Sequence, residues 1–289
     1  MNAVQGYLFI LPNLVGFIVF SLFSIGFSAL ISFTNWDMIT PLNEVQFIGF
    51  QNFIDLFTDE WFVESILNNL YFMAFIPLYL FAALVVAALL NGSVYFSKLI
   101  RTIIYMPYVT NIVIVSLLWS YLLKPDGGIV NEILKIIGIA NPPQWFGSTF
   151  WVKPALVLIT LWQGLGYNSL IYLTGLQSIS KDLYEAADVY GASKVRQFFT
   201  ITIPMITPTT FFMLITSLIG TFQMWSNVQI LTSGGPGTAS TVIGFYIYRT
   251  AFQYGEMGYA SSMAWILFIF VLIITLIQWR GQKKWVNYI

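Results

Sequence analysis

The chain contains no cysteine and no histidine, and only 8% of its 289 residues are charged. Without cysteine there is no disulfide framework and no thiol nucleophile, and without histidine the commonest general base and metal ligand is missing. These absences disfavour an enzyme active site. The formal net charge is zero and no basic run stands out, so the electrostatic footprint of a nucleic-acid-binding protein is also missing.

Apolar residues are correspondingly abundant. They make up 58% of the sequence, and the charged share lies far below the roughly 25% of an ordinary soluble domain. This composition indicates a protein whose main surroundings are a lipid bilayer.

Charge-free windows locate the spans, because a helix that crosses the hydrocarbon needs about 20 mainly apolar residues. One apolar region is too long for a single helix, and TSGGPGTAST (232–241) breaks it with three glycines and a proline. We predict an all-α integral membrane protein, residues 1–289 forming one transmembrane domain. The approximate helix cores are 8–33, 67–90, 102–123, 155–178, 205–226 and 260–279.

Lysine and arginine set the orientation, since cytoplasmic loops carry the excess of both. Six spans put both termini on one side, and we predict that this side is the cytoplasm, with 35–64, 124–153 and 227–256 outside. The start, MNAVQG, has no basic residue before the first span, which indicates a trimmed or incompletely numbered N-terminus and not a cleaved signal peptide. The basic residues then inside are Lys98, Arg101, Lys181, Lys194, Arg196, Arg280, Lys283 and Lys284.

Residues 181–204 form a charged loop between two apolar segments. Ser180 is expected to cap a short amphipathic helix that Gly191 ends, and a second amphipathic segment, ASKVRQFF, then leads toward Pro204. An isolated helix of about ten residues is marginal in water, so this loop needs a partner surface.

The same loop carries a spaced pattern. Glu185, Ala186 and Ala187 are followed by Gly191, Ile201, Ile203 and Pro204. The pattern resembles the loop of binding-protein-dependent ABC importer permeases, with Ile203 where that family usually has Leu. Tyr190 stands where the carbohydrate branch often has Asp, and the nearby acid is Asp188. Further segments resemble the carbohydrate-type permeases, specifically the larger-partner branch of the maltose and glycerol-phosphate importers. These segments are FTNWD, FIGFQNF, RTIIYMPYV, WQGLGYNSLIYLTGLQSI, LTSGGPG, YIYRTAF and GYASS.

The resemblance implies a type I importer permease fold with a cytoplasmic coupling helix, in a bacterial or archaeal cytoplasmic membrane. It implies a second homologous permease, two cytoplasmic ATPase subunits that bind ATP and Mg, an extracytoplasmic solute-binding protein and a sugar solute. The chain itself is then no enzyme and holds no cofactor or metal. The residues implied in coupling to the ATPase are Glu185, Ala186, Ala187, Asp188, Gly191, Ile201 and Pro204.

Two sequence features have other interpretations. SGGPG is glycine-rich but lacks the lysine of a phosphate-binding loop, so we interpret it as a structural loop at the outer face. Three acidic residues stand at helical spacing, namely Asp182, Glu185 and Asp188. They could form a metal or acid/base site, or only a solvated face of the helix. The resemblance favours a third interpretation, contact with an ATPase.

Solute contacts are expected in the third, fourth and fifth helices, as in sugar-type permeases. Amides and hydroxyls suit sugar hydroxyls, and aromatic rings suit the apolar faces of pyranose rings. Helix packing is the rival interpretation for each residue. No charge lies in these stretches, which favours a neutral saccharide. The candidates are Tyr108, Asn111, Trp162, Gln163, Gly164, Tyr167, Asn168, Ser217, Thr221, Gln223, Met224 and Asn227.

Three alternatives stay open. An ion-coupled secondary transporter would need internal repeats or ionisable residues within its spans, and the sequence offers neither. A membrane-embedded hydrolase or transferase would need a nucleophile and a base within the bilayer. An ABC importer permease for a solute other than a sugar shares every feature given above.

Overall fold

The computed structural model describes residues 3–92 and 95–287, and every regular element within them is a helix. The one β feature among these residues is an isolated bridge between Thr34 and Phe47. In chain order the elements are α1 (Ala3–Gly16), the π-helical η1 (Phe17–Leu22), α2 (Phe23–Ile31), α3 (Gln51–Asp55), α4 (Glu60–Ala74), α5 (Ile76–Asn91), α6 (Ser97–Val109), α7 (Ile112–Leu122), α8 (Ile129–Ile136), α9 (Val152–Gln177), α10 (Lys181–Val189), α11 (Lys194–Gln197), the π-helical η2 (Phe198–Thr202), α12 (Ile203–Met205), α13 (Thr207–Phe222), α14 (Trp225–Leu231), α15 (Ile243–Phe252), α16 (Met257–Gly281) and the 3-10 turn η3 (Gln282–Lys284).

Four stretches of the described chain are long and apolar enough to cross a membrane, and two bent helix pairs raise the number to six if each pair is one span. This confirms the predicted all-helical class, and four predicted spans coincide with helices. The four unbent stretches are Phe9–Ile31, Glu60–Asn91, Val152–Gln177 and Met257–Lys284.

The predicted span 102–123 is wrong as a single helix, because the chain bends by 97° between α6 and α7. Thr110 is extended, and both its backbone N–H and its hydroxyl donate to the Met106 carbonyl, at 3.1 and 2.8 Å. Asn111 then starts α7 as its N-cap, since its side-chain oxygen accepts from Val113 N at 2.8 Å. Local capping therefore ends one helix and begins the next.

The predicted span 205–226 also differs, because the chain bends by 62° around Ile206 and α13 ends at Phe222. Pro208 has no N–H for the Pro204 carbonyl four residues earlier, and its ring would crowd that carbonyl in a straight helix. The Thr207 hydroxyl donates to the Pro204 carbonyl instead, at 2.7 Å. The bend is thus a proline bend with its freed carbonyl satisfied.

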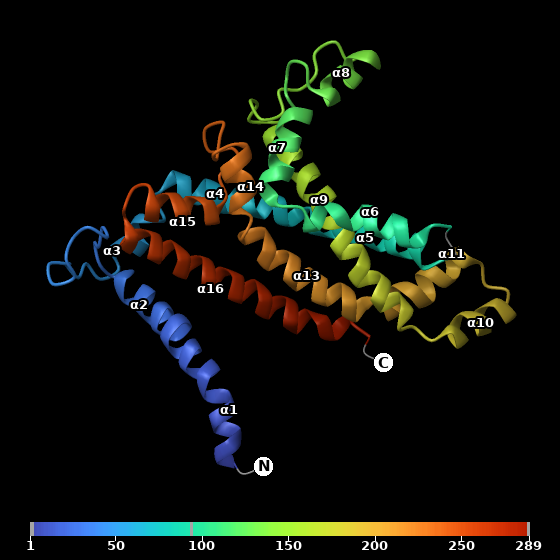
Figure 1. The fold of residues 1–289 in the computed structure, drawn as a ribbon, viewed down its shortest axis with the longest axis horizontal. Coiled ribbons are helices and arrows are strands. Elements are labelled where there is room, and N and C mark those ends of the chain that lie inside the picture. The colour runs from blue at the N-terminus through green and yellow to red at the C-terminus, as the bar shows by residue number, and fades with distance from the viewer. Residues whose placement is uncertain (1–2, 93–94, 288–289) are drawn as a thin grey trace. The chain divides into compact units, whose positions relative to one another are not determined.

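The chain forms two compact units, each built from two separate stretches. The first is Met1–Val63 with Tyr246–Val271, and the second is Glu64–Phe245 with Leu272–Ile289. In the first unit, α1, η1 and α2 continue one another (Figure 1), and buried Asn52 donates to the Ser32 and Thr34 carbonyls, both at 2.9 Å.

In the second unit, α9 packs along α5 and α6. The α6 backbone lies directly against Gly166 of α9, where an added Cβ would meet the Ile104 carbonyl. Such close contact between backbones requires a small residue, as is common between membrane helices.

Two fully buried amides of α4 hold the second unit together. Asn68 Nδ2 donates to the Thr238 and Thr241 carbonyls, both at 2.8 Å. Asn69 Nδ2 donates to the Thr221 carbonyl at 2.9 Å, and its Oδ1 accepts from Ile243 N at 2.8 Å. The glycine-rich stretch 232–241 is therefore fixed to α4 through backbone groups.

Candidate functional site

The charged loop has the helix, glycine and helix order that the sequence predicts. Ser180 caps α10 by accepting from Asp182 N at 3.3 Å, and Ser193 caps α11 by accepting from Arg196 N at 3.3 Å. Between the two helices, Gly191 has φ +71°, so its backbone is left-handed. The predicted internal order of the loop is confirmed.

The carboxylate of Asp188 closes the corner between α10 and α11. Lys194 Nζ lies 2.7 and 2.8 Å from its two oxygens, and Gln197 Nε2 donates to Oδ1 at 2.5 Å. The hydrogen bonds from Lys194 and Gln197 stabilise the ionised carboxylate and hold the pKa of Asp188 below its ordinary value.

The other predicted coupling residues lie around this corner. Glu185 and Ala186 are exposed on α10, and Ala187 is half-buried. Ile201 and Pro204 are half-buried on the segment that leads back toward α13. The exposed face of the loop also carries apolar side chains, among them Val189 and Tyr190, which are 86% and 90% exposed.

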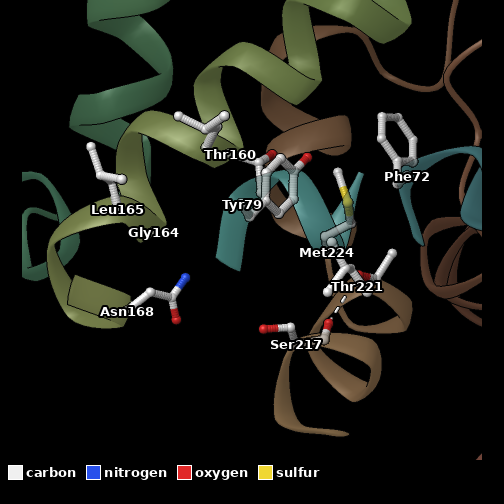
Figure 2. A pocket seen from close by; sticks show the side chains of 12 residues that line it. Phe72, Tyr79, Thr160, Gly164, Leu165, Asn168, Ser217, Thr221 and Met224 are labelled. Carbon is white, nitrogen blue, oxygen red and sulfur yellow. Dashed lines mark hydrogen bonds between the residues drawn. The ribbon is translucent and has the colours of Figure 1, made fainter. Parts of the chain in front are cut away.

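A cavity of about 230 Å³ lies within the second unit, between α4, α5, α9 and α13. Figure 2 shows Thr160, Gly164, Leu165 and Asn168 of α9 along one side of it, and Ser217 of α13 on another. The complete lining is Phe72, Ile76, Tyr79, Thr160, Leu161, Gly164, Leu165, Asn168, Ser217, Gly220, Thr221 and Met224.

Neutral polar groups are available in this cavity. The Asn168 amide and the Ser217 hydroxyl make no hydrogen bond with other described residues, whereas the hydroxyls of Thr160 and Thr221 donate to helix carbonyls at 2.7 and 2.9 Å. The lining contains no charged side chain. An apolar cavity with a few free amides and hydroxyls suits an uncharged polar ligand.

The cavity brings together part of the predicted solute set. Gly164, Asn168, Ser217, Thr221 and Met224 line it. The wall of the cavity on α4 and α5 is not among the predicted contacts, because the resemblance places solute contacts only in the third to fifth spans. The missed residues with a functional character are Phe72 and Tyr79, and clustered aromatic side chains in an apolar span were the only available signal.

The remaining candidates lie elsewhere. Tyr167 stacks on Tyr108 of α6, with ring centroids 4.6 Å apart and planes at 16°, and Trp162 meets Trp119 edge to face at 5.6 Å. Asn111 caps α7. Gln163 is half-buried, Gln223 is exposed and Asn227 is buried, and none of the three lines the cavity.

Comparison with known proteins adds to this geometry. Residues 79–280 match the model of the family described as "Binding-protein-dependent transport system inner membrane component". The chain is 34% identical to the probable ABC transporter permease protein YurN of Bacillus subtilis (strain 168), over 98% of this chain and 97% of that protein. It is 32% identical to the lactose transport system permease protein LacF of Rhizobium radiobacter, over 97% and 95%.

A solved structure has the same fold. The chain matches a chain of the bacterial alginate ABC transporter, crystallised in complex with its alginate pentasaccharide-bound periplasmic protein, with a TM-score of 0.85 and 26% identity. The match covers 97% of this chain and 94% of that one.

Proposed function

Since this chain belongs to the family of binding-protein-dependent transport system inner membrane components, we propose that it is half of the translocation pathway of an ATP-driven importer for a sugar or oligosaccharide. Within that assembly it pairs with a second homologous permease, and an extracytoplasmic solute-binding protein delivers the solute to the outer face.

The observation that carries this proposal is the pairing, in one chain, of an uncharged apolar cavity that holds a few free polar groups with an ordered, exposed charged loop. The cavity offers the Asn168 amide, the Ser217 hydroxyl and the Tyr79 ring, which suit sugar hydroxyls and the apolar face of a sugar ring. Relatives named for lactose and alginate transport support a carbohydrate solute.

The loop is the docking element for an ATPase subunit in this proposal. Glu185 is exposed and has no ion pair among the described residues, so it is free to accept from a basic or amide group of that subunit. Ala186 and Ala187 keep the packed face thin. ATP and Mg are bound by the ATPase, both termini are cytoplasmic, and closure of the two ATPases moves α10 and switches the cavity between outward and inward access.

Reconstitution tests this function directly. The permease pair, the ATPase and the binding protein are placed in lipid nanodiscs and liposomes, and ATP hydrolysis and uptake are measured with the binding protein loaded from a panel of neutral saccharides, uronates, sugar phosphates and amino acids. We expect a neutral saccharide to stimulate both. Uptake driven by an ion gradient without ATP would refute the importer, and stimulation by amino acids alone would refute the carbohydrate class.

Tyr167 does not line the cavity but stacks on Tyr108, and two variants test whether this stack also belongs to the solute path, as the resemblance to sugar-type permeases implies. Tyr167→Phe keeps the ring that stacks on Tyr108 and removes the hydroxyl, whereas Tyr167→Ala removes both. If the ring faces the sugar, Tyr167→Ala impairs uptake with assembly intact, and Tyr167→Phe retains most of it. Normal uptake in both variants would remove Tyr167 from the path.

A further inference from the structure

Three side chains form a closed ring of hydrogen bonds at the corner between α10 and α11. We name them the corner cluster: Asp188, Lys194 and Gln197. Lys194 Nζ pairs with the Asp188 carboxylate at 2.7 Å and donates to Gln197 Oε1 at 3.3 Å, while Gln197 Nε2 donates to Asp188 at 2.5 Å. Gln197 Nε2 also donates to the Ala192 carbonyl at 2.9 Å. Every member therefore contacts the other two, and the cluster spans both sides of Gly191.

An exposed ion pair alone would do little. The side chains of Lys194 and Asp188 are 77% and 51% exposed, and such pairs are weak because water and salt screen them. Gln197 differs, since only 2% of it is exposed and its amide is fixed by the Ala192 carbonyl. This buried amide holds the Asp188 carboxylate in place, so the ion pair forms on a prearranged acceptor.

The two helices on either side of Gly191 differ in length. α10 has nine residues, too few to be stable alone, whereas α11 continues without a break through η2 and α12 to Met205. Gly191 has no side chain, and an added Cβ there would meet nothing within 4 Å, so packing at the glycine itself does not restrain the joint. The side-chain contacts across the joint come from the corner cluster and from the hydrogen bond between Tyr184 and Thr202.

The corner borders a hydrogen bond to the following helix and a hollow next to the spans. Tyr184 and Thr202 share a hydrogen bond between their hydroxyls at 2.9 Å, which ties α10 to η2. A cavity of about 420 Å³ separates the corner from the cytoplasmic ends of α5 and α9, lined among others by Asn91, Leu176 and Lys194. Lys194 and Gln197 of the corner cluster therefore face the ends of α5 and α9 across this hollow.

We propose that Asp188, Lys194 and Gln197 are positioning residues that make α10 and α11 one rigid elbow, so that displacement of α10 reaches η2 and α13 and is not absorbed at Gly191. This inference rests on the proposed function, and it assigns Asp188 to the inside of the elbow and not to the ATPase contact. Without the corner cluster the ATPase still docks and still hydrolyses ATP. The displacement of α10 is then absorbed by bending at Gly191 and does not reach α13.

The test compares Asp188→Ala, Gln197→Ala and the conservative variant Asp188→Asn. In Asp188→Asn the side-chain oxygen can still accept from Lys194 Nζ and Gln197 Nε2, and Gln197 keeps its bond to the Ala192 carbonyl, so the ring can form without the carboxylate charge. The matched control is Glu132→Ala, which removes the exposed ion pair of Glu132 with Lys135, 2.8 Å apart, on α8.

We expect the ATPase to co-purify normally with all variants. Uptake per ATP hydrolysed falls at least about five-fold in Asp188→Ala and Gln197→Ala, the lower end of ordinary coupling between sites, and Asp188→Asn retains most of it. Wild-type uptake per ATP in Asp188→Ala, or an Asp188→Asn variant no better than Asp188→Ala, overturns the proposal. Loss of the ATPase from the complex also overturns it, because Asp188 would then be a docking residue.

A spin-label distance measurement tests whether the angle between α10 and α11 is fixed, and it needs no transport assay. Spin labels on cysteines at positions 181 and 196 are free of background because the chain has no native cysteine. The distance distribution is narrow in the parent and broad in Asp188→Ala if the corner cluster sets the angle, and equal widths refute it. If the wild-type complex shows no ATP-driven uptake, the proposed function fails while this measurement still decides the elbow.

Discussion

Gly166→Ala tests the contact between α6 and α9, on which the Tyr108–Tyr167 stack depends. The new Cβ would overlap the Ile104 carbonyl oxygen and lie 2.7 Å from Tyr105 Cα, whereas ordinary contacts begin at 3.4 Å. Both obstacles are backbone atoms, so no side-chain rotation relieves them. At Tyr105 the backbone of α6 must retreat by roughly 0.7 Å or more, and overpacking of this kind costs about 1–3 kcal/mol.

Gly220→Ala is the matched control, since Gly220 lies within a membrane helix of the same unit, α13, and an added Cβ there meets nothing within 4 Å. Both substitutions gain the same helix propensity, up to about 1 kcal/mol, so the difference between the variants isolates the clash. In nanodiscs, the melting temperature of Gly166→Ala should fall at least about 2 °C below that of Gly220→Ala. Uptake should fall as well, because the Tyr108 ring moves away from Tyr167.

Equal melting temperatures of the two variants would refute this reasoning. They would show that α6 is free to shift relative to α9, and that the close contact at Gly166 is not what positions the tyrosine stack.

The remaining predictions concern topology and the loop. A cysteine at Ser148 should react with an impermeant maleimide on intact cells, and a cysteine at Ser193 only after permeabilisation; labelling of position 193 from outside would reverse the orientation. Gly191→Val should cost about 1–2 kcal/mol through its left-handed backbone alone, since the site is open. Its ATPase should co-purify poorly or lose solute-stimulated hydrolysis, and Glu185→Lys should do the same; full ATPase recovery with normal transport in both would reduce the loop to a solvated connector.

The sequence predicts the spans well where apolar composition alone decides them. The bends are different, because they depend on single hydrogen bonds. Pro208 was a usable signal for the bend at Ile206, since its effect on Pro204 follows from covalent structure. The bend at Thr110 depends on which groups cap each helix, and an average over a window does not contain that information.

The site is less predictable than the spans. Tyr167 and Asn168 are adjacent in sequence and about 100° apart around α9, so one stacks on Tyr108 while the other lines the cavity. The sequence places both in the same polar stretch and does not say which helix faces which neighbour. Asn111 shows the same limit, because an amide in a polar stretch can bind solute or cap a helix, and here it caps α7.

The corner cluster can be predicted from the sequence only in part. The helix, the glycine and the second helix follow from capping residues and spacing. That Asp188 turns inward to Lys194 and Gln197 follows from the left-handed corner at Gly191, which reverses the chain and brings residues six and nine positions apart into contact.

The amides of Asn68 and Asn69 have a consequence for biosynthesis. Three of their bonds are made to residues 170, 173 and 174 positions further along the chain. A ribosome adding about 5–20 residues per second needs on the order of 10–30 s to reach those partners. During that interval α4 has left the ribosome with two amides that cannot yet be satisfied as in the finished protein, and in hydrocarbon each unsatisfied group is costly. The second span should therefore remain beside the insertion machinery until α15 has been translated.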